Sequence, residues 1–176
     1  MIFQETKLNG FFIIEPEINE DDRGSFTRYF CMKELAEIDI NFNIVQISRS
    51  ITKHRGTIRG MHFQIEPMQE SKIVQCLKGT IYDVVIDLRP NSLTYGQWVG
   101  EKLSGNNRKM FLIPKGFAHG FQTISNNCEV QYLMSEYYSL KNSLGVNWAD
   151  PLFNIKWPIK SPILSEKDKN WPLIKK

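Results

Sequence analysis

Residues 72–88 read KIVQCLKGTIYDVVIDL and carry the strongest signal for the fold. Apolar and β-branched residues dominate Lys72–Leu77 and Thr80–Leu88, as is typical of strands. Lys78-Gly79 between them is typical of a hairpin or another tight turn. The stretch therefore predicts β-structure at the centre of the chain.

The same alternation of short strands and turns continues on both sides of this stretch. Thr57–Gln64 is strand-like, and Met32–Ile38 is the one segment with a helical composition. Short strands at this spacing indicate an all-β sandwich or barrel. Four prolines from Pro151 onward predict that the C-terminal segment wraps this barrel as an irregular arm. Further strands are predicted at 11–14, 25–30, 44–48, 109–113 and 129–134, with turns at 22–24, 89–92, 104–107 and 114–116.

Length and composition favour one domain spanning residues 1–176. The 176 residues are 41% hydrophobic and 23% charged, enough to bury a core without disulfides or metals. Three cysteines with no C-x-x-C spacing are expected to be reduced, small buried residues. The net charge of +3 comes from dispersed basic residues, which disfavours nucleic acid as a partner but permits a small phosphorylated ligand.

No apolar run approaches the ~18 residues that a membrane-spanning helix needs, and no signal-peptide pattern occurs at the N-terminus. We therefore expect no membrane association and a cytoplasmic location.

Proton chemistry is suggested by Thr57–Gln64, TIRGMHFQ, which places Arg59 and His62 three residues apart in a chain with three histidines. Strand alternation puts Gln46, Ser48 and Ser50 on one face of their strand. Polar side chains from several strands are then expected to meet in the mouth of a barrel, a common ligand site. The set is Gln46, His62, Lys72 and Tyr132, with His119 nearby between glycines.

Each of these residues also has a structural interpretation. His62 can be a hydrogen-bonded structural histidine, Lys72 an edge-strand charge that discourages aggregation, and Tyr132 an ordinary core aromatic. Composition and periodicity alone predict a soluble all-β domain with a polar pocket.

Seven segments in order carry a more specific signal, because together they resemble the dTDP-4-dehydrorhamnose 3,5-epimerase family. The resemblance runs from about Gly10 to Asp168. The segments are Asp22–Phe26, Thr57–Gln64, Lys72–Cys76, Asp83–Arg89, Thr94–Trp98, Ile113–Phe121 and Ile163–Asp168.

This resemblance implies a cupin fold, the double-stranded β-helix or jelly-roll barrel, with short helices. It also implies a homodimer that needs no metal or other cofactor. The chain lacks the close His-x-His pair of metal-binding cupins, and two isolated histidines do not make a metal site.

The family's substrate is a nucleotide-linked 4-keto-6-deoxyhexose, whose C4 carbonyl acidifies the hydrogens on C3 and C5. Epimerisation at these carbons needs a base, an oxyanion stabiliser and an acid on the opposite face of the ring. By position in the family motifs, His62 is expected to be the base and Asp168 the carboxylate that orients it. Tyr132 matches the acid, and Lys72 matches the group that stabilises the enolate.

The resemblance also assigns binding residues. Arg23 matches an arginine that reaches the diphosphate, in relatives often from the neighbouring subunit, and Arg59 matches a second basic residue. Gln46, His119 and Tyr138 match positions that line the sugar or nucleotide pocket, Tyr138 by stacking on the base.

Two departures from the family pattern concern binding. Ser48 stands where many relatives carry an asparagine, and the loop Ser139–Leu144 lacks an acidic residue that some relatives place near the nucleotide. Ser48 is nevertheless expected to be a binding residue. Asp83 is expected near the site as a partner of His119.

The leading hypothesis is an isomerase that converts dTDP-4-dehydro-6-deoxy-D-glucose to dTDP-4-dehydro-L-rhamnose for polysaccharide biosynthesis. Its rivals are an epimerase acting at C3 or C5 alone, or one acting on a CDP- or GDP-linked keto sugar or heptose. A non-catalytic sugar-nucleotide binding module and a metal-dependent cupin oxygenase are alternatives from other classes.

Overall fold

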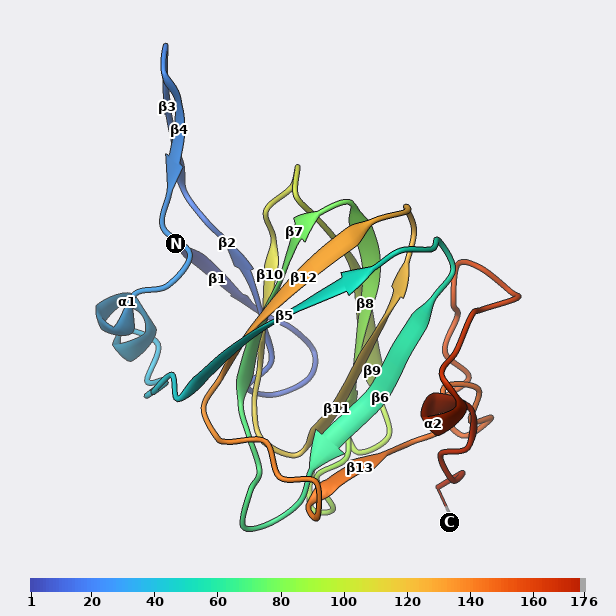
Figure 1. Cartoon of the computed structure of the whole chain (residues 1–176). Helices are drawn as coiled ribbons and strands as arrows, with labels where there is room; N and C mark the ends of the chain where they lie inside the picture. Colours follow the sequence, from blue (N-terminus) through green and yellow to red (C-terminus); the bar gives the residue numbers. More distant parts are fainter. Residues whose placement is uncertain (175–176) are drawn as a thin grey trace.

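Two antiparallel sheets form the body of the molecule in the computed structural model, which describes residues 1–174 (Figure 1). The six-stranded sheet has the order β1 (Ile2–Glu5), β2 (Phe12–Glu15), β10 (Met110–Ile113), β7 (Lys72–Lys78), β12 (Cys128–Met134), β5 (Gln46–Thr52). The five-stranded sheet has the order β13 (Ser143–Gly145), β6 (Ile58–Gln64), β11 (Phe117–Thr123), β8 (Thr80–Asp87), β9 (Trp98–Ser104).

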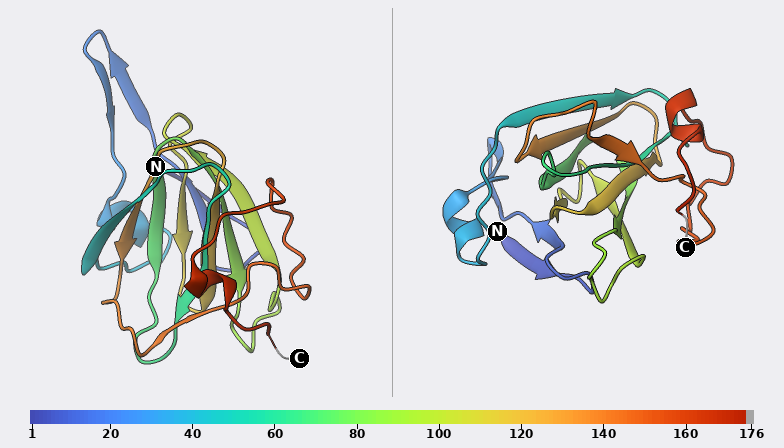
Figure 2. Two further views of the ribbon diagram at one scale, coloured as in Figure 1. Left: turned by 45° about the vertical axis from the view of Figure 1, so that its right-hand side comes forward. Right: turned by 90° about the horizontal axis from the view of Figure 1, so that it is seen from below.

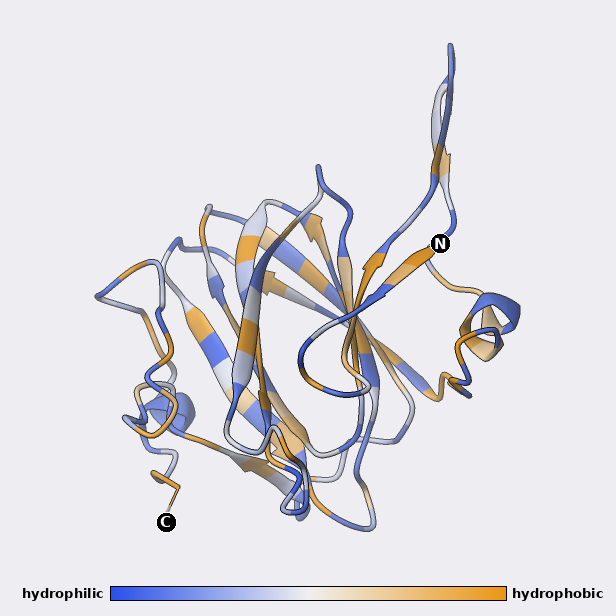
Figure 3. Cartoon of the chain, turned by 180° about the vertical axis from the view of Figure 1, so that it is seen from behind, coloured by the Kyte–Doolittle hydropathy of each residue, from blue (hydrophilic) through white to orange (hydrophobic). Residues whose placement is uncertain are grey.

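The main core lies between these sheets. Val74 and Val130 of the six-stranded sheet pack with Val85 and Phe121 of the five-stranded sheet in one fully buried cluster. Alternation along the strands supplies this inner face, and hydrophilic and hydrophobic residues accordingly alternate along the ribbons (Figure 3). The two sheets enclose a common interior (Figure 2). The prediction of an all-β jelly-roll barrel is confirmed.

Two other segments cover the outer faces of the sheets. The short helix α1 (Met32–Ala36) and the residues after it pack Leu35 and Phe42 against Ile73 and Leu133 of the six-stranded sheet. On the opposite side, the C-terminal segment packs Phe153 against outward-facing residues of the five-stranded sheet. Up to residue 174 the one helix of this segment is α2 (Glu166–Lys169), so the predicted irregular arm is confirmed.

A third, separate pair of strands projects from the barrel (Figure 1). β3 (Ile18–Asp21) and β4 (Gly24–Thr27) form a two-stranded hairpin whose residues are almost all exposed. The predicted strand 25–30 is therefore wrong beyond Thr27, because the chain turns there toward α1.

The fold also corrects other predictions. β7 and β8 are not paired: at Lys78-Gly79 the chain crosses from one sheet to the other, so this tight turn does not close a hairpin. The strand predicted at 44–48 is β5, which starts two residues later and runs on to Thr52. β1, β3, β9, β11 and β13 were not predicted, since they are short or interrupted by glycine and lack a clear alternation. Among residues 1–174, no helix is long and apolar enough to cross a membrane.

Candidate active site

A cavity of about 330 Å³ opens between the two sheets and the C-terminal arm. Its walls come from β5, β6, β7, β11, β12, β13 and α2, together with residues just outside these elements. The lining residues are Ser50, Arg59, His62, Phe63, Gln64, Glu70, Lys72, His119, Phe121, Tyr132, Met134, Tyr138, Ser143, Lys167 and Asp168.

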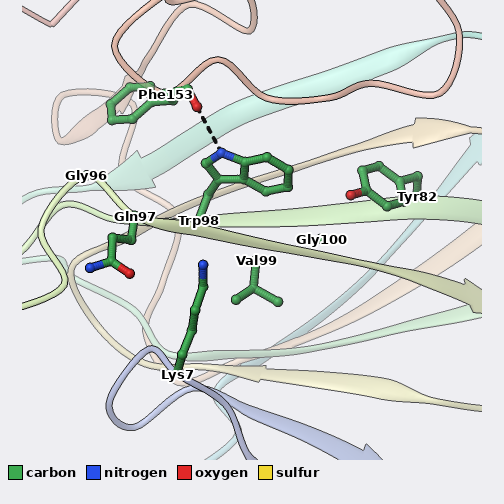
Figure 4. A pocket seen from close by; sticks show the side chains of 8 residues that line it. All are labelled: Lys7, Tyr82, Gly96, Gln97, Trp98, Val99, Gly100 and Phe153. Atoms are coloured by element: carbon green, nitrogen blue, oxygen red, sulfur yellow. Dashed lines mark hydrogen bonds between the residues drawn. The ribbon is translucent and has the colours of Figure 1, made fainter.

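A larger and more open hollow, of about 640 Å³, lies elsewhere, beside β9 (Figure 4). Figure 4 shows the Lys7 side chain reaching toward Gln97 and Trp98. The indole N–H of Trp98 donates a hydrogen bond to the backbone oxygen of Phe153 at 2.8 Å. The residues that line this hollow include Lys7 and Tyr82 but no carboxylate or histidine, so it offers no histidine–carboxylate pair. We therefore place the chemistry in the smaller cavity.

Two glycines bring the site's two histidines together. β6 and β11 pair with His62 opposite His119, and the register shifts just beyond this point. A Cβ on Gly120 would lie 2.7 Å from the backbone oxygen of Arg59 and 2.9 Å from the Cα of Gly60. Gly60 has φ +138°, a conformation that side chains rarely adopt. The close approach of the two strands thus requires glycine at both positions.

His62 is held by Asp168, which reaches it from the C-terminal arm. His62 Nε2 lies 2.7 Å from Asp168 Oδ1 across a separation of 106 residues. Ser165 caps α2 by accepting a hydrogen bond from the Asp168 backbone N–H at 3.1 Å, which fixes the start of the helix.

The charge on Asp168 decides which nitrogen of His62 is basic. Burial alone would raise the pKa of this carboxyl. The hydrogen bond and the charge of His62 lower the pKa, and so do the hydrogen bonds from the Gly60 backbone and the Trp171 side chain, so that together they outweigh burial. The pKa of Asp168 therefore lies below its ordinary value, and the group is ionised at neutral pH. Nε2 of His62 then carries a proton, which leaves Nδ1 as the basic nitrogen.

A second histidine–carboxylate pair lies deeper in the barrel. His119 Nε2 is 2.7 Å from Asp83 Oδ1, and the ring of Tyr132 meets the His119 ring edge to face at 6.2 Å. Burial raises the pKa of Asp83, and His119 offsets this only in part. Burial also raises the pKa of Tyr132, whose hydroxyl lies 3.4 Å from Ser50 Oγ, so this phenol is protonated at neutral pH.

Lys72 is buried and paired with a carboxylate of its own segment. Its Nζ lies 2.7 Å from Glu70 Oε1, and both side chains are 7% exposed. Glu70 Oε2 is buried and has no hydrogen-bond partner among the described residues. Lys72 is therefore the charge partner of Glu70.

Two further cations line the cavity with no carboxylate partner among residues 1–174. Arg59 donates to Thr52 Oγ1 at 2.9 Å and to the backbone oxygen of Ile51 at 3.3 Å. Lys167 Nζ lies over the ring of Trp171, 5.2 Å from its centroid. Uncompensated cations at a cavity wall suit an anionic ligand such as a diphosphate.

The structure brings most of the residues predicted from the sequence to this cavity. His62, Lys72, Tyr132, Asp168, Arg59, His119 and Tyr138 all line it, Tyr138 at the rim with 55% of its surface exposed. Gln46 and Ser48 do not line it. Gln46 instead accepts the backbone N–H of Tyr138 at 3.1 Å and contacts Ser48 at 3.4 Å.

Arg23 lies on the projecting hairpin and not on the elements that form the cavity. It sits at the turn of the β3–β4 hairpin with a 90% exposed side chain, paired with Asp21 at 2.6 Å. It does not line the cavity of its own chain.

Sequence reasoning missed several lining residues. Ser50 lies on the same predicted strand face as Gln46 and Ser48. Alternation did not tell which of these three positions along the strand reaches the cavity. Glu70 and Lys167 each lie within two residues of a predicted site residue, which is the signal that could have found them. No group of three or more His, Cys, Asp or Glu side chains that could hold a metal ion occurs among the described residues.

Comparison with known proteins identifies similar chains over the full length of the fold. A sequence profile described as dTDP-4-dehydrorhamnose 3,5-epimerase matches residues 5–176. The enzyme of that name from Methanothermobacter thermautotrophicus is 44% identical over 172 residues, which cover 96% of this chain and 92% of the relative.

Solved structures agree. The crystal structure of dTDP-4-dehydrorhamnose 3,5-epimerase from Bacillus anthracis with TDP and PPi bound superposes with a TM-score of 0.96 at 43% identity, covering 98% of this chain and 99% of that one. The epimerase from Legionella pneumophila in complex with dTDP-4-keto-L-rhamnose has a TM-score of 0.92 at 37% identity, covering 98% of this chain and 92% of that one.

Proposed function

The chain belongs to the dTDP-4-dehydrorhamnose 3,5-epimerase family, and we propose that it epimerises C3 and C5 of dTDP-4-dehydro-6-deoxy-D-glucose to form dTDP-4-dehydro-L-rhamnose. The expectation of an epimerase is confirmed by this membership. One observation supports the assignment most strongly: the His62–Asp168 pair, the protonated Tyr132 and the buried Lys72 line one cavity.

The proposed reaction begins at His62. Its Nδ1 removes the proton from a carbon beside the C4 carbonyl, and the electron pair of the broken C–H bond moves to the carbonyl oxygen to form an enolate. The Lys72 ammonium stabilises this oxygen in a water-poor site, where a fixed charge has its largest effect. Asp168 stabilises the imidazolium that forms on His62.

Tyr132 completes the epimerisation. Its phenolic proton passes to the same carbon from the opposite face as the carbonyl re-forms, which inverts the centre. Exchange with water then removes the proton from His62 and restores that of Tyr132. The raised pKa of this buried phenol supports the role, because the group must hold its proton until the carbanion accepts it.

Binding is proposed to use the cations at the cavity wall. Arg59 and Lys167, neither of them paired with a carboxylate in the described chain, suit the diphosphate. Tyr138 at the rim offers a partly exposed ring for the base, and His119 faces the sugar. Gln46 and Ser48 would then contribute indirectly, by positioning Tyr138. Gln46 accepts a hydrogen bond from the Tyr138 backbone N–H, and Ser48 contacts Gln46.

We further propose a homodimer in which residues 1–176 act as one domain and the β3–β4 hairpin serves the second copy. An isolated two-stranded hairpin is only marginally stable in water, yet this one carries Phe26 with 68% of its surface exposed. Ile47 and Ile51 on the outer face of β5 are more than half exposed as well. A second copy would cover this apolar surface and would receive Arg23 at its own cavity. A cytoplasmic location, where nucleotide sugars are made, fits the proposal.

Incubation with dTDP-4-keto-6-deoxyglucose in heavy water, followed by NMR, tests the proposed reaction. We expect deuterium at both C3 and C5 and a product with L-rhamno configuration, because each inverted carbon receives its proton from a solvent-exchanged group. Deuterium at a single carbon would instead establish the mono-epimerase. CDP- and GDP-linked sugars in parallel samples identify the nucleotide.

Two controls separate the remaining alternatives. His62→Ala should lower the rate by about 10²-fold or more, whereas unchanged turnover would point to a binding module. Full activity in excess chelator is expected if no metal takes part, and loss of activity that added metal restores would contradict this expectation.

A further inference from the structure

Trp171 contacts the His62–Asp168 pair from the side that faces away from the cavity. Its indole N–H donates to Asp168 Oδ1 at 3.2 Å, and this is the same oxygen that lies 2.7 Å from His62 Nε2. The indole and imidazole rings stand edge to face, with centroids 6.1 Å apart. Trp171 is not among the residues that line the cavity, so its contact with the site runs through Asp168 and His62.

The position of this indole is set by a glycine in β13. A Cβ at Gly145 would overlap the six-membered and five-membered rings of Trp171, so the indole lies directly against the strand backbone. Asn147 Nδ2 donates to the backbone oxygen of Trp171 at 3.1 Å and secures the same segment. The ring is thus seated on the five-stranded sheet independently of Asp168.

The face of the Trp171 indole contacts Lys167. The Lys167 ammonium lies 5.2 Å from the centroid of the ring, within the range of a cation–π interaction. Lys167 also lines the cavity, next to Asp168. The Trp171 side chain therefore contacts both Asp168, the partner of the proposed base His62, and Lys167, a proposed phosphate-binding cation.

We propose that Trp171 is a positioning residue with two separable effects. Its N–H orients the Asp168 carboxylate as the ionised partner of His62, and its ring face holds Lys167 at the cavity wall. This inference rests on the proposed function, because it assigns Trp171 a part in the same site.

Two substitutions separate these effects. Trp171→Phe keeps an aromatic face but removes the N–H, so we expect kcat to fall about tenfold, the equivalent of one hydrogen bond to a charged group, with KM within twofold of the wild type. Trp171→Leu removes the face as well, so KM should rise in addition. An unchanged kcat in Trp171→Phe would overturn the orienting effect, and an unchanged KM in Trp171→Leu would overturn the effect on Lys167.

Trp157 offers a matched control in the same arm. Its indole N–H donates to the backbone oxygen of Trp148 at 2.9 Å, and it lines no part of the cavity. Trp157→Phe thus loses an indole hydrogen bond away from the site, and we expect its kcat and KM to match the wild type. An equal fall in kcat for both phenylalanine variants would mean that loosening of the arm, and not orientation of Asp168, causes the loss.

An NMR measurement tests the contact without any catalysis. The four tryptophans give four indole N–H resonances, and the one missing in Trp171→Phe belongs to Trp171. Asp168→Asn removes the acceptor's charge and should shift that resonance upfield, while the Trp157 resonance stays in place. An unmoved Trp171 resonance would overturn the inference. A shifted one in a protein that epimerises no sugar would instead disprove the proposed function and leave the Trp171–Asp168 contact established.

Discussion

At the scale of single residues, the electrostatic balance of the site depends on the buried Glu70–Lys72 pair. Lys72 Nζ is 2.7 Å from Glu70 Oε1, and the other oxygen of Glu70 has no partner among residues 1–174. Lys72→Met would leave a buried carboxylate without its counter-charge, so we expect a loss of about 3–5 kcal/mol in the free energy of unfolding. Urea unfolding at pH 7 measures this loss.

The double variant Lys72→Met with Glu70→Gln is the control for this prediction. It removes both charges, and most of the lost stability should return, although activity should stay low without the Lys72 ammonium. A double variant as unstable as Lys72→Met alone would show that packing, and not the unpaired charge, is responsible.

At the scale of elements, the site depends on how closely β6 and β11 approach. Gly120→Ala would place a methyl group 2.7 Å from the backbone oxygen of Arg59 and push the strands apart where His62 and His119 pair. We expect a loss of about 1–3 kcal/mol in stability, typical of overpacking, together with a fall in kcat. Thermal unfolding and steady-state kinetics measure the two effects.

Ala118→Gly is the matched change in the same strand. It removes a buried methyl group next to His119 without forcing β11 away from β6, so stability should fall while kcat is retained. Equal losses of kcat in the two variants would contradict the idea that strand spacing controls the site.

At the scale of the whole molecule, the exposed apolar surface predicts association of two copies. The hairpin exposes Phe26 beside Asn19, its partner across the two strands. We expect light scattering to give twice the 20.5 kDa chain mass, and Phe26→Ser to shift the protein toward monomer because it removes apolar contact area.

Asn19→Ser is the control for this shift, since it changes the opposite residue without removing apolar surface and should leave the dimer intact. A wild-type protein that is monomeric at micromolar concentration would contradict the dimer. Arg23→Ala should raise KM and leave the mass unchanged, because its proposed role is to bind the diphosphate.

The sequence by itself determined the fold class and the chemical character of the site. Strand periodicity and turn residues are local properties, so Lys72–Leu77, Thr80–Leu88 and most of the main strands could be predicted before any contact was known. The motif segments, taken in order, also identified the family, which the comparisons confirm. The inward face of β5 followed from alternation alone.

Only the tertiary structure decided which of those residues meet. It placed β7 and β8 in different sheets, brought Asp168 to His62 across 106 residues, and put Ser50 rather than Gln46 at the cavity wall. It also placed the Trp171 indole within hydrogen-bond distance of Asp168, and it placed Arg23 on the projecting hairpin, outside the cavity of its own chain. The physical reason is that strand periodicity fixes which way a side chain points, whereas its depth and partners depend on the packing of distant segments.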